Sequence, residues 1–78
     1  MLSHNEVIDR YYLDARCELL EIAAMLDRYD RAFAADRSMS DTQNPKLTKI
    51  FEMLEILADR NALPDRTKRI LALLSQLD

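Results

Sequence analysis

The sequence contains no glycine, and this absence excludes several kinds of binding site. Loops that bind phosphate groups and turns that bind dinucleotides need glycine, because the backbone must approach the ligand closely with positive φ. The chain therefore has neither a P-loop nor a Rossmann fingerprint. Tight β-hairpin turns also depend on glycine, so the composition argues against a β fold.

Cysteine and histidine occur once each, as Cys17 and His4. A single cysteine cannot form an intrachain disulfide, and one cysteine with one histidine cannot make a zinc site of the usual Cys/His type. We therefore predict no cofactor and no bound metal. A domain of this size buries only about 60% of the surface that its unfolded chain exposes. Dimerisation is then the common remaining way to gain stability.

The same scarcity argues against catalysis. His4 is expected in the first turn of a helix, and no motif surrounds it that would supply a nucleophile or a second catalytic group. Cys17 has acidic residues as its expected helical neighbours, and negative charge disfavours a reactive thiolate. The sequence therefore predicts no catalytic residues and a protein that is not an enzyme.

Long apolar runs are also missing. None approaches the roughly 20 residues of a membrane-spanning helix, and the opening residues, MLSHNEVIDR, lack the basic start and apolar core of a signal peptide. Hydrophobic residues make up 49% of the chain and charged residues 32%, which is typical of a globular protein. We expect a cytoplasmic protein with no membrane partner.

What the sequence does contain is helical periodicity. Ser3 and Glu6 match the capping box that starts a helix, and Leu2 and Val7 occupy the positions of a hydrophobic staple. The spacing predicts a long helix over residues 4–36, reaching roughly 50 Å at 1.5 Å per residue. Its apolar residues, spaced alternately by four and three, form a heptad stripe that we expect to be the main core: Ile8, Tyr12, Ala15, Leu19, Ile22, Leu26, Tyr29 and Phe33.

A polar segment without periodicity, residues 37–44, is predicted to be a linker. Asn44 followed by Pro45 is typical of the cap and first residue of a helix, which we expect over residues 45–60. Asn61 is a plausible left-handed residue for the end of this helix, in place of glycine.

Pro64 is expected to open a third helix over residues 64–77. These features predict an all-α fold and a single helical domain over residues 1–78. The long first helix would pack antiparallel against the two shorter ones. Two arrangements stay open: the short helices lie end to end in a helical hairpin, or the third folds back beside the second in a three-helix bundle.

The long helix has a second apolar face, which runs from Leu13 to Ala24. Almost opposite the heptad stripe on a helical wheel, four residues spaced by four, three and four form what we call the island: Leu13, Cys17, Leu20 and Ala24. Charged residues bound it at both ends. A surface helix needs only one apolar stripe, so the island is covered either by another helix of the same chain or by a second chain, most simply in a two-fold dimer.

The sequence is compatible with two other functions. The second and third helices resemble a helix-turn-helix, in which Arg66, Lys68 and Arg69 would contact nucleic acid. The set is small and the chain carries a net charge of −3, which argues against a nucleic-acid partner. Asp14, Glu18 and Glu21 line one flank of the long helix, where carboxylates can form a metal or small-ligand site in a bundle. The Glu-x-x-His pairing of di-iron bundles is missing.

Two stretches, DARCELLEIAAMLDRYDRA and PDRTKRILALLS, are similar to small bacterial all-helical proteins of unassigned function. The resemblance covers under half of the chain and implies no activity, cofactor or site residue. From the residues themselves, the prediction is a non-catalytic protein-interaction module that forms a homodimer or binds another protein.

Overall fold

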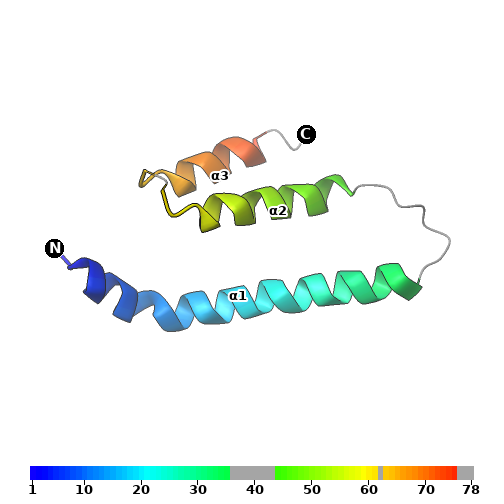
Figure 1. The fold of residues 1–78 in the computed structure, drawn as a ribbon, viewed down its shortest axis with the longest axis horizontal. Helices are drawn as coiled ribbons and strands as arrows, with labels where there is room; N and C mark the ends of the chain where they lie inside the picture. The colour runs from blue at the N-terminus through cyan, green and yellow to red at the C-terminus, as the bar shows by residue number, and fades with distance from the viewer. Residues whose placement is uncertain (36–43, 62, 76–78) are drawn as a thin grey trace. The chain divides into compact units, whose positions relative to one another are not determined.

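The computed structural model describes residues 1–35, 44–61 and 63–75. These residues form three α-helices, α1 (His4–Ala35), α2 (Pro45–Ala58) and α3 (Arg66–Leu74), and no strand (Figure 1). The prediction of an all-α fold is therefore confirmed. The chain divides into two compact units, Met1–Ser40, which contains α1, and Asp41–Asp78, which contains α2 and α3.

Helix α1 begins with the predicted capping box. The backbone N–H of Glu6 donates to the Ser3 hydroxyl oxygen at 3.2 Å, and the backbone N–H of Ser3 donates to a Glu6 carboxylate oxygen at 3.1 Å. Two amides at the helix start, which have no partner inside the helix, are satisfied in this way. The helix runs for 32 residues, through Ala35, and the last residue of the predicted range lies outside the described residues.

Helix α2 also begins as predicted. The side-chain oxygen of Asn44 accepts from the backbone N–H of Lys46 at 2.9 Å and from that of Leu47 at 3.2 Å, and Pro45 occupies the first helical position. Proline suits this position because its fixed φ is already helical and its missing N–H would have had no helical partner. Apart from Asn44, the predicted linker over residues 37–44 lies outside the described residues.

The end of α2 differs from the prediction. The helix stops at Ala58, two residues early, because Asp59 takes an extended backbone conformation with φ −72° and ψ 101°. The predicted left-handed Asn61 is wrong, since no residue that the structure describes has positive φ. Instead, the Asp59 carboxylate accepts the Asn61 backbone N–H at 3.0 Å. A side-chain turn of this kind redirects the chain without a left-handed residue.

Helix α3 begins two residues later than predicted. The backbone N–H of Asp65 donates to the Leu63 carbonyl at 2.6 Å, so Pro64 lies in a tight turn before the helix. Asp65, with φ −130°, is the cap residue, and its carbonyl accepts the first helical N–H, from Arg69, at 2.9 Å. At the other end α3 stops at Leu74, and residues 76–78 lie outside the described part of the chain.

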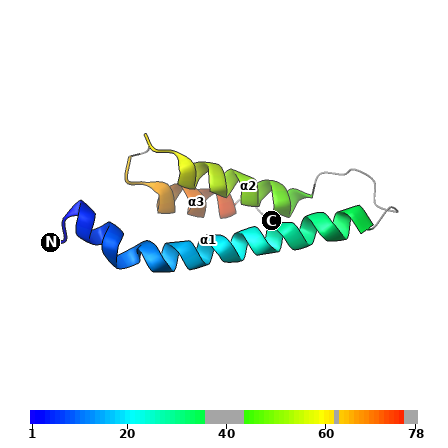
Figure 2. The same ribbon diagram turned by 60° about the horizontal axis from the view of Figure 1, so that its bottom comes forward.

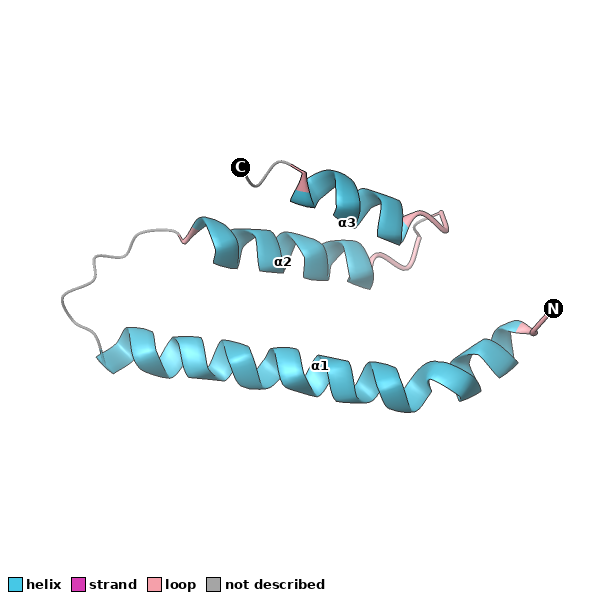
Figure 3. Cartoon of the chain, turned by 180° about the vertical axis from the view of Figure 1, so that it is seen from behind, coloured by secondary structure: helices cyan, strands magenta, loops and turns pink. Residues whose placement is uncertain are grey.

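Helices α2 and α3 lie side by side and run in opposite directions (Figures 1 and 3). The turned view of Figure 2 shows the same pairing. Of the two arrangements that the sequence left open, α3 therefore folds back beside α2, and the end-to-end arrangement is not adopted. Both helices contribute half-buried apolar side chains: Leu47, Ile50, Met53, Leu54, Ile56, Ile70 and Leu73.

None of the described residues is buried, so α1 forms no core along the heptad stripe by itself, and that core stays a prediction. Ile8, Tyr12 and Leu19 are 63%, 60% and 54% exposed. Farther along, Ile22, Leu26, Tyr29 and Phe33 are half-buried, and the rings of the last two stack with centroids 6.2 Å apart. Heptad spacing orients side chains along one face of a helix, but burial also needs a second surface on that face.

Candidate functional site

The island occupies the middle of α1, and the helix alone brings its four residues onto one face. Leu13 and Leu20 are each 61% exposed, and Cys17 and Ala24 are exposed as well. Cys17 carries a free thiol. The predicted interface residues therefore form a continuous apolar surface on α1 that this helix does not itself cover.

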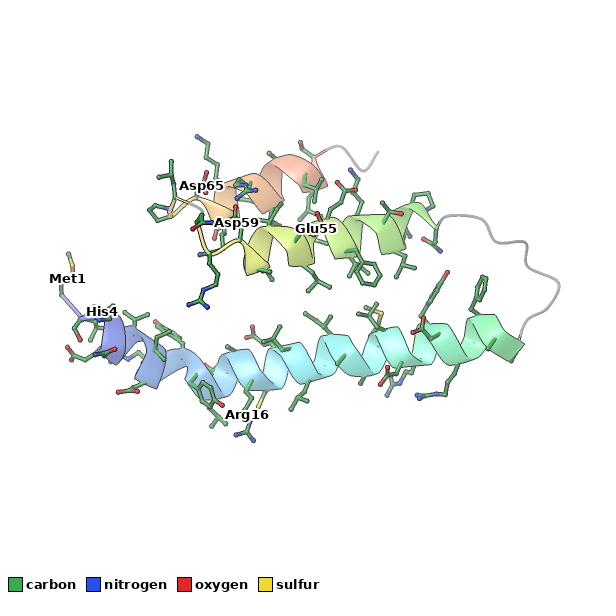
Figure 4. All side chains as sticks on the ribbon, viewed as in Figure 1. Met1, His4, Arg16, Glu55, Asp59 and Asp65 are labelled. Carbon is green, nitrogen blue, oxygen red and sulfur yellow. The ribbon has the colours of Figure 1, made fainter. Side chains whose placement is uncertain are left out.

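Because the exposed half of the heptad stripe lies nearly opposite, α1 presents large apolar side chains on two sides. Figure 4 shows side chains projecting from α1 in several directions. Scattered exposed apolar residues are ordinary on protein surfaces. Leu13 and Leu20 lie seven residues apart on one face, with small residues between and beyond them, and so form a contiguous patch instead of isolated exposed residues.

Charged residues bound the island along the same face. The spacing of three and four that relates its members continues outward to Arg10 and Glu6 on one side and to Asp27 and Arg31 on the other. All four are exposed. Glu6 also serves the capping box, where the Ser3 backbone N–H and hydroxyl hold the pKa of its carboxyl below the ordinary range. Its negative charge is thus favoured beside the positive end of the helix dipole.

The acidic flank of α1 places its three carboxylates along one helix. Asp14, Glu18 and Glu21 are all exposed. Within the described ranges, no three His, Cys, Asp or Glu side chains come together as the ligands of a metal ion. Carboxylate sites in bundles need ligands from facing helices, whereas these three residues come from one helix.

A polar cluster, which we call the Asp59 cluster, joins the end of α2 to α3. It consists of Asp59, Asn61, Arg66 and Arg69. Arg69 donates to a carboxylate oxygen of Asp59 at 3.2 Å, and the Arg66 guanidinium donates to the Asp59 backbone carbonyl. The Asn61 backbone N–H, followed by the Arg69 guanidinium, holds the pKa of the Asp59 carboxyl below its ordinary value. Figure 4 labels Asp59 where α2 ends, near Asp65 at the start of α3.

This cluster changes the interpretation of the predicted nucleic-acid contacts. Arg66 and Arg69 are half-buried and bind Asp59 of their own chain, while Lys68 is exposed. The helices of a helix-turn-helix cross at about 90–120°, whereas α2 and α3 run antiparallel. Two of the three predicted nucleic-acid contacts are therefore engaged within their own chain, and the described α2 and α3 are not arranged as in a helix-turn-helix.

Sequence reasoning did not find the Asp59 cluster. Asp59 belongs to one of several Asp-Arg pairs in the sequence, and nothing local distinguishes it from the others. Its partners are 7 and 10 residues away, beyond a turn whose path no local pattern specifies. The available signal was the position of an acidic residue at the expected end of α2, where the helix dipole favours a nearby positive charge.

His4, the first residue of α1, is exposed (Figure 4). Its polar neighbours Ser3 and Glu6 are hydrogen-bonded to each other in the capping box. The site therefore has the geometry of a helix cap.

Comparison with known proteins finds no match to a family model, to a curated protein or to a solved structure. None of the described helices is both long enough and apolar enough to cross a membrane. The resemblance to small bacterial helical proteins stays a prediction from the sequence.

Proposed function

We propose that this chain is a non-catalytic protein-interaction module that forms a homodimer through the island of α1. The observation that carries the proposal is the exposure of Leu13 and Leu20, which are 61% exposed on the same face of one helix. A two-fold dimer covers both at once, because such an interface pairs the same patch of each subunit.

The energetics favour a reversible dimer. Burying a leucine completely stabilises association by roughly 1.5–3 kcal/mol, and a two-fold interface buries four of them, each already partly covered. Association costs about 4 kcal/mol or more in lost translational and rotational freedom. The free energy gained by apolar burial is comparable with this cost of association, so we expect the island to support a dimer of modest affinity. We expect the dimer to dissociate on dilution.

A second copy of the chain supplies the same apolar residues to cover the island, whereas an adaptor role needs a different protein as the partner. The packing of α1 against the two short helices and a cytoplasmic location also stay predictions from the sequence. The nucleic-acid and metal-site alternatives are not favoured by the geometry of the Asp59 cluster or of the acidic flank.

Sedimentation of two matched variants tests the proposal. Leu20→Glu places a carboxylate in the contact, where burial without a partner is costly, and should shift the protein to monomer with its helical content retained. Leu71→Glu is the control, because Leu71 in α3 has the same 61% exposure and lies outside the island. A wild-type chain that stays monomeric at high concentration would contradict the proposal, as would a dimer that both variants leave intact.

A further inference from the structure

The island is the centre of a longer regular pattern on α1, which we call the seam. Extending the spacing of the island by two positions at each end gives eight exposed residues separated alternately by four and three: Glu6, Arg10, Leu13, Cys17, Leu20, Ala24, Asp27 and Arg31. They span about 38 Å of helix at 1.5 Å per residue. A seam of this spacing is the face that one helix presents to another in a coiled coil.

The charges of the seam are complementary when one copy is reversed. In an antiparallel pair with its two-fold axis between Cys17 and Leu20, Glu6 faces Arg31 of the second copy. Arg10 then faces Asp27. By symmetry each pairing occurs twice, so every charged layer of the seam joins opposite charges.

The apolar layers fit the same register. Leu13 faces Ala24 of the second copy, and Cys17 faces Leu20. Each layer therefore combines a leucine with a smaller side chain. Alternation of large and small residues across facing positions fills the space between two helices evenly.

A parallel pair fails on the same residues. In-register parallel helices place each seam position opposite itself, so Arg10 faces Arg10, Asp27 faces Asp27, and the outer positions also repeat their own charge. Like charges across an interface are unfavourable and suppress that pairing. The charges of the eight seam residues thus favour the antiparallel orientation, whereas the flanking Glu21 lies nearest an acidic residue in that register.

We infer that α1 pairs with α1 of a second copy in an antiparallel two-fold dimer along the seam. This inference rests on the proposed homodimer and adds the orientation and the register. The occupant of the island is then a second copy of this chain, chosen by charge complementarity between the two ends of the same helix.

A charge-swap series distinguishes the two orientations. Arg10→Asp and Asp27→Arg, each alone, replace two attractive layers of the antiparallel dimer with repulsive ones. Each should raise the dissociation constant of the dimer by about tenfold, since exposed ion pairs contribute up to roughly 1 kcal/mol each. The double variant restores both layers and should recover the wild-type constant. In a parallel dimer, every variant only exchanges one pair of like charges for another, and no loss and recovery would be seen.

Glu21→Lys gives a second test with opposite signs. Glu21 flanks the seam, and in the antiparallel register its nearest flanking partner is the acidic Asp14 of the second copy. In a parallel pair the nearest partner is Arg16 instead. The substitution should therefore tighten an antiparallel dimer and loosen a parallel one, and a loosened dimer overturns the orientation.

Disulfide trapping locates the register. We would mix two full-length chains of different mass, both carrying Cys17→Ala, one with Leu13→Cys and the other with Ala24→Cys. The antiparallel dimer brings positions 13 and 24 of different chains within disulfide reach, while two copies of position 13 are about 16 Å apart along the axis. We expect disulfides between the two kinds of chain and none between chains of the Leu13→Cys kind.

The outcomes separate this inference from the proposed function. A dimer that forms disulfides between two Leu13→Cys chains is parallel, which overturns the orientation and leaves the homodimer standing. A monomeric wild type overturns both. A dimer that neither Leu20→Glu nor the charge swaps affect uses another face, which also overturns both.

Discussion

The carboxylate of Asp59, directly after α2, accepts a hydrogen bond from the Arg69 guanidinium in α3, with 3.2 Å between the two atoms. An acidic residue is disfavoured at a helix C-terminus, where the helix dipole is negative. Arg69 offsets that charge, and Arg66 binds the Asp59 carbonyl, one of the helix-end groups that lack a helical partner. Two charged residues of α3 thus complete the end of α2 and hold the turn between the helices.

We expect the Asp59–Arg69 pair to stabilise the α2–α3 hairpin modestly. The two side chains are 38% and 39% exposed, so water and salt screen their interaction. Arg69→Gln should lower the urea midpoint of unfolding, and more at low salt than at high salt. In a double-mutant cycle with Asp59→Asn, the two losses should not add. Strictly additive losses would show that the pair does not couple the two helices.

Acid should weaken the same hairpin. The pKa of Asp59 is lowered in the folded chain, first by the Asn61 backbone N–H and then by Arg69. The folded state therefore favours the ionised carboxylate. This contribution is complete above the unfolded pKa, about 4 for aspartate, and is lost as the pH falls through the lower folded pKa.

Helical content of the wild type and of Asp59→Asn, followed by circular dichroism from neutral to acid pH, measures this effect. The variant should show a smaller acid-induced loss, because it has no carboxylate to protonate at this position. Equal losses in the two proteins would assign the pH dependence to other acidic groups, of which Glu6, whose pKa is also lowered, is the first to examine with Glu6→Gln.

Ser3→Ala should destabilise the start of α1 by about 1 kcal/mol, the typical effect of removing a capping hydroxyl. The Glu6 amide, which now donates to the Ser3 hydroxyl oxygen at 3.2 Å, loses its acceptor. Faster hydrogen exchange of the first-turn amides would report the loss. Ser3→Asp is the control, since aspartate caps helices as well as serine does. Equal exchange in wild type and Ser3→Ala would show that the cap contributes little.

His4→Ala should leave the fold, the proposed dimer and any cellular phenotype of the protein unchanged. His4 is exposed, and the capping pair beside it, Ser3 and Glu6, makes its hydrogen bonds without the imidazole. Circular dichroism and sedimentation verify that the variant is intact before a phenotype is compared. Loss of the phenotype in a folded, dimeric variant would revive a catalytic role.

The island could be identified from the sequence because residues spaced by three and four share a helix face whatever surrounds the helix. What covers the island could not be identified from the sequence, since the same pattern is compatible with a cover from the chain itself or from a second chain. The heptad stripe shows that helical spacing does not by itself predict burial. Leu19 has the spacing of a core residue and is 54% exposed on α1, since spacing orients a side chain and only a packing partner can bury it.

The sequence by itself determined where α1 and α2 begin. Ser3 with Glu6, and Asn44 with the amides that follow it, make hydrogen bonds across at most three residues, so a few adjacent side chains suffice to specify each start. Only the tertiary structure decided that α3 folds back beside α2 and that Asp59 meets Arg66 and Arg69. Those contacts join residues 7 and 10 positions apart across a turn, so they depend on the packing of the two helices as well as on the residues of the turn.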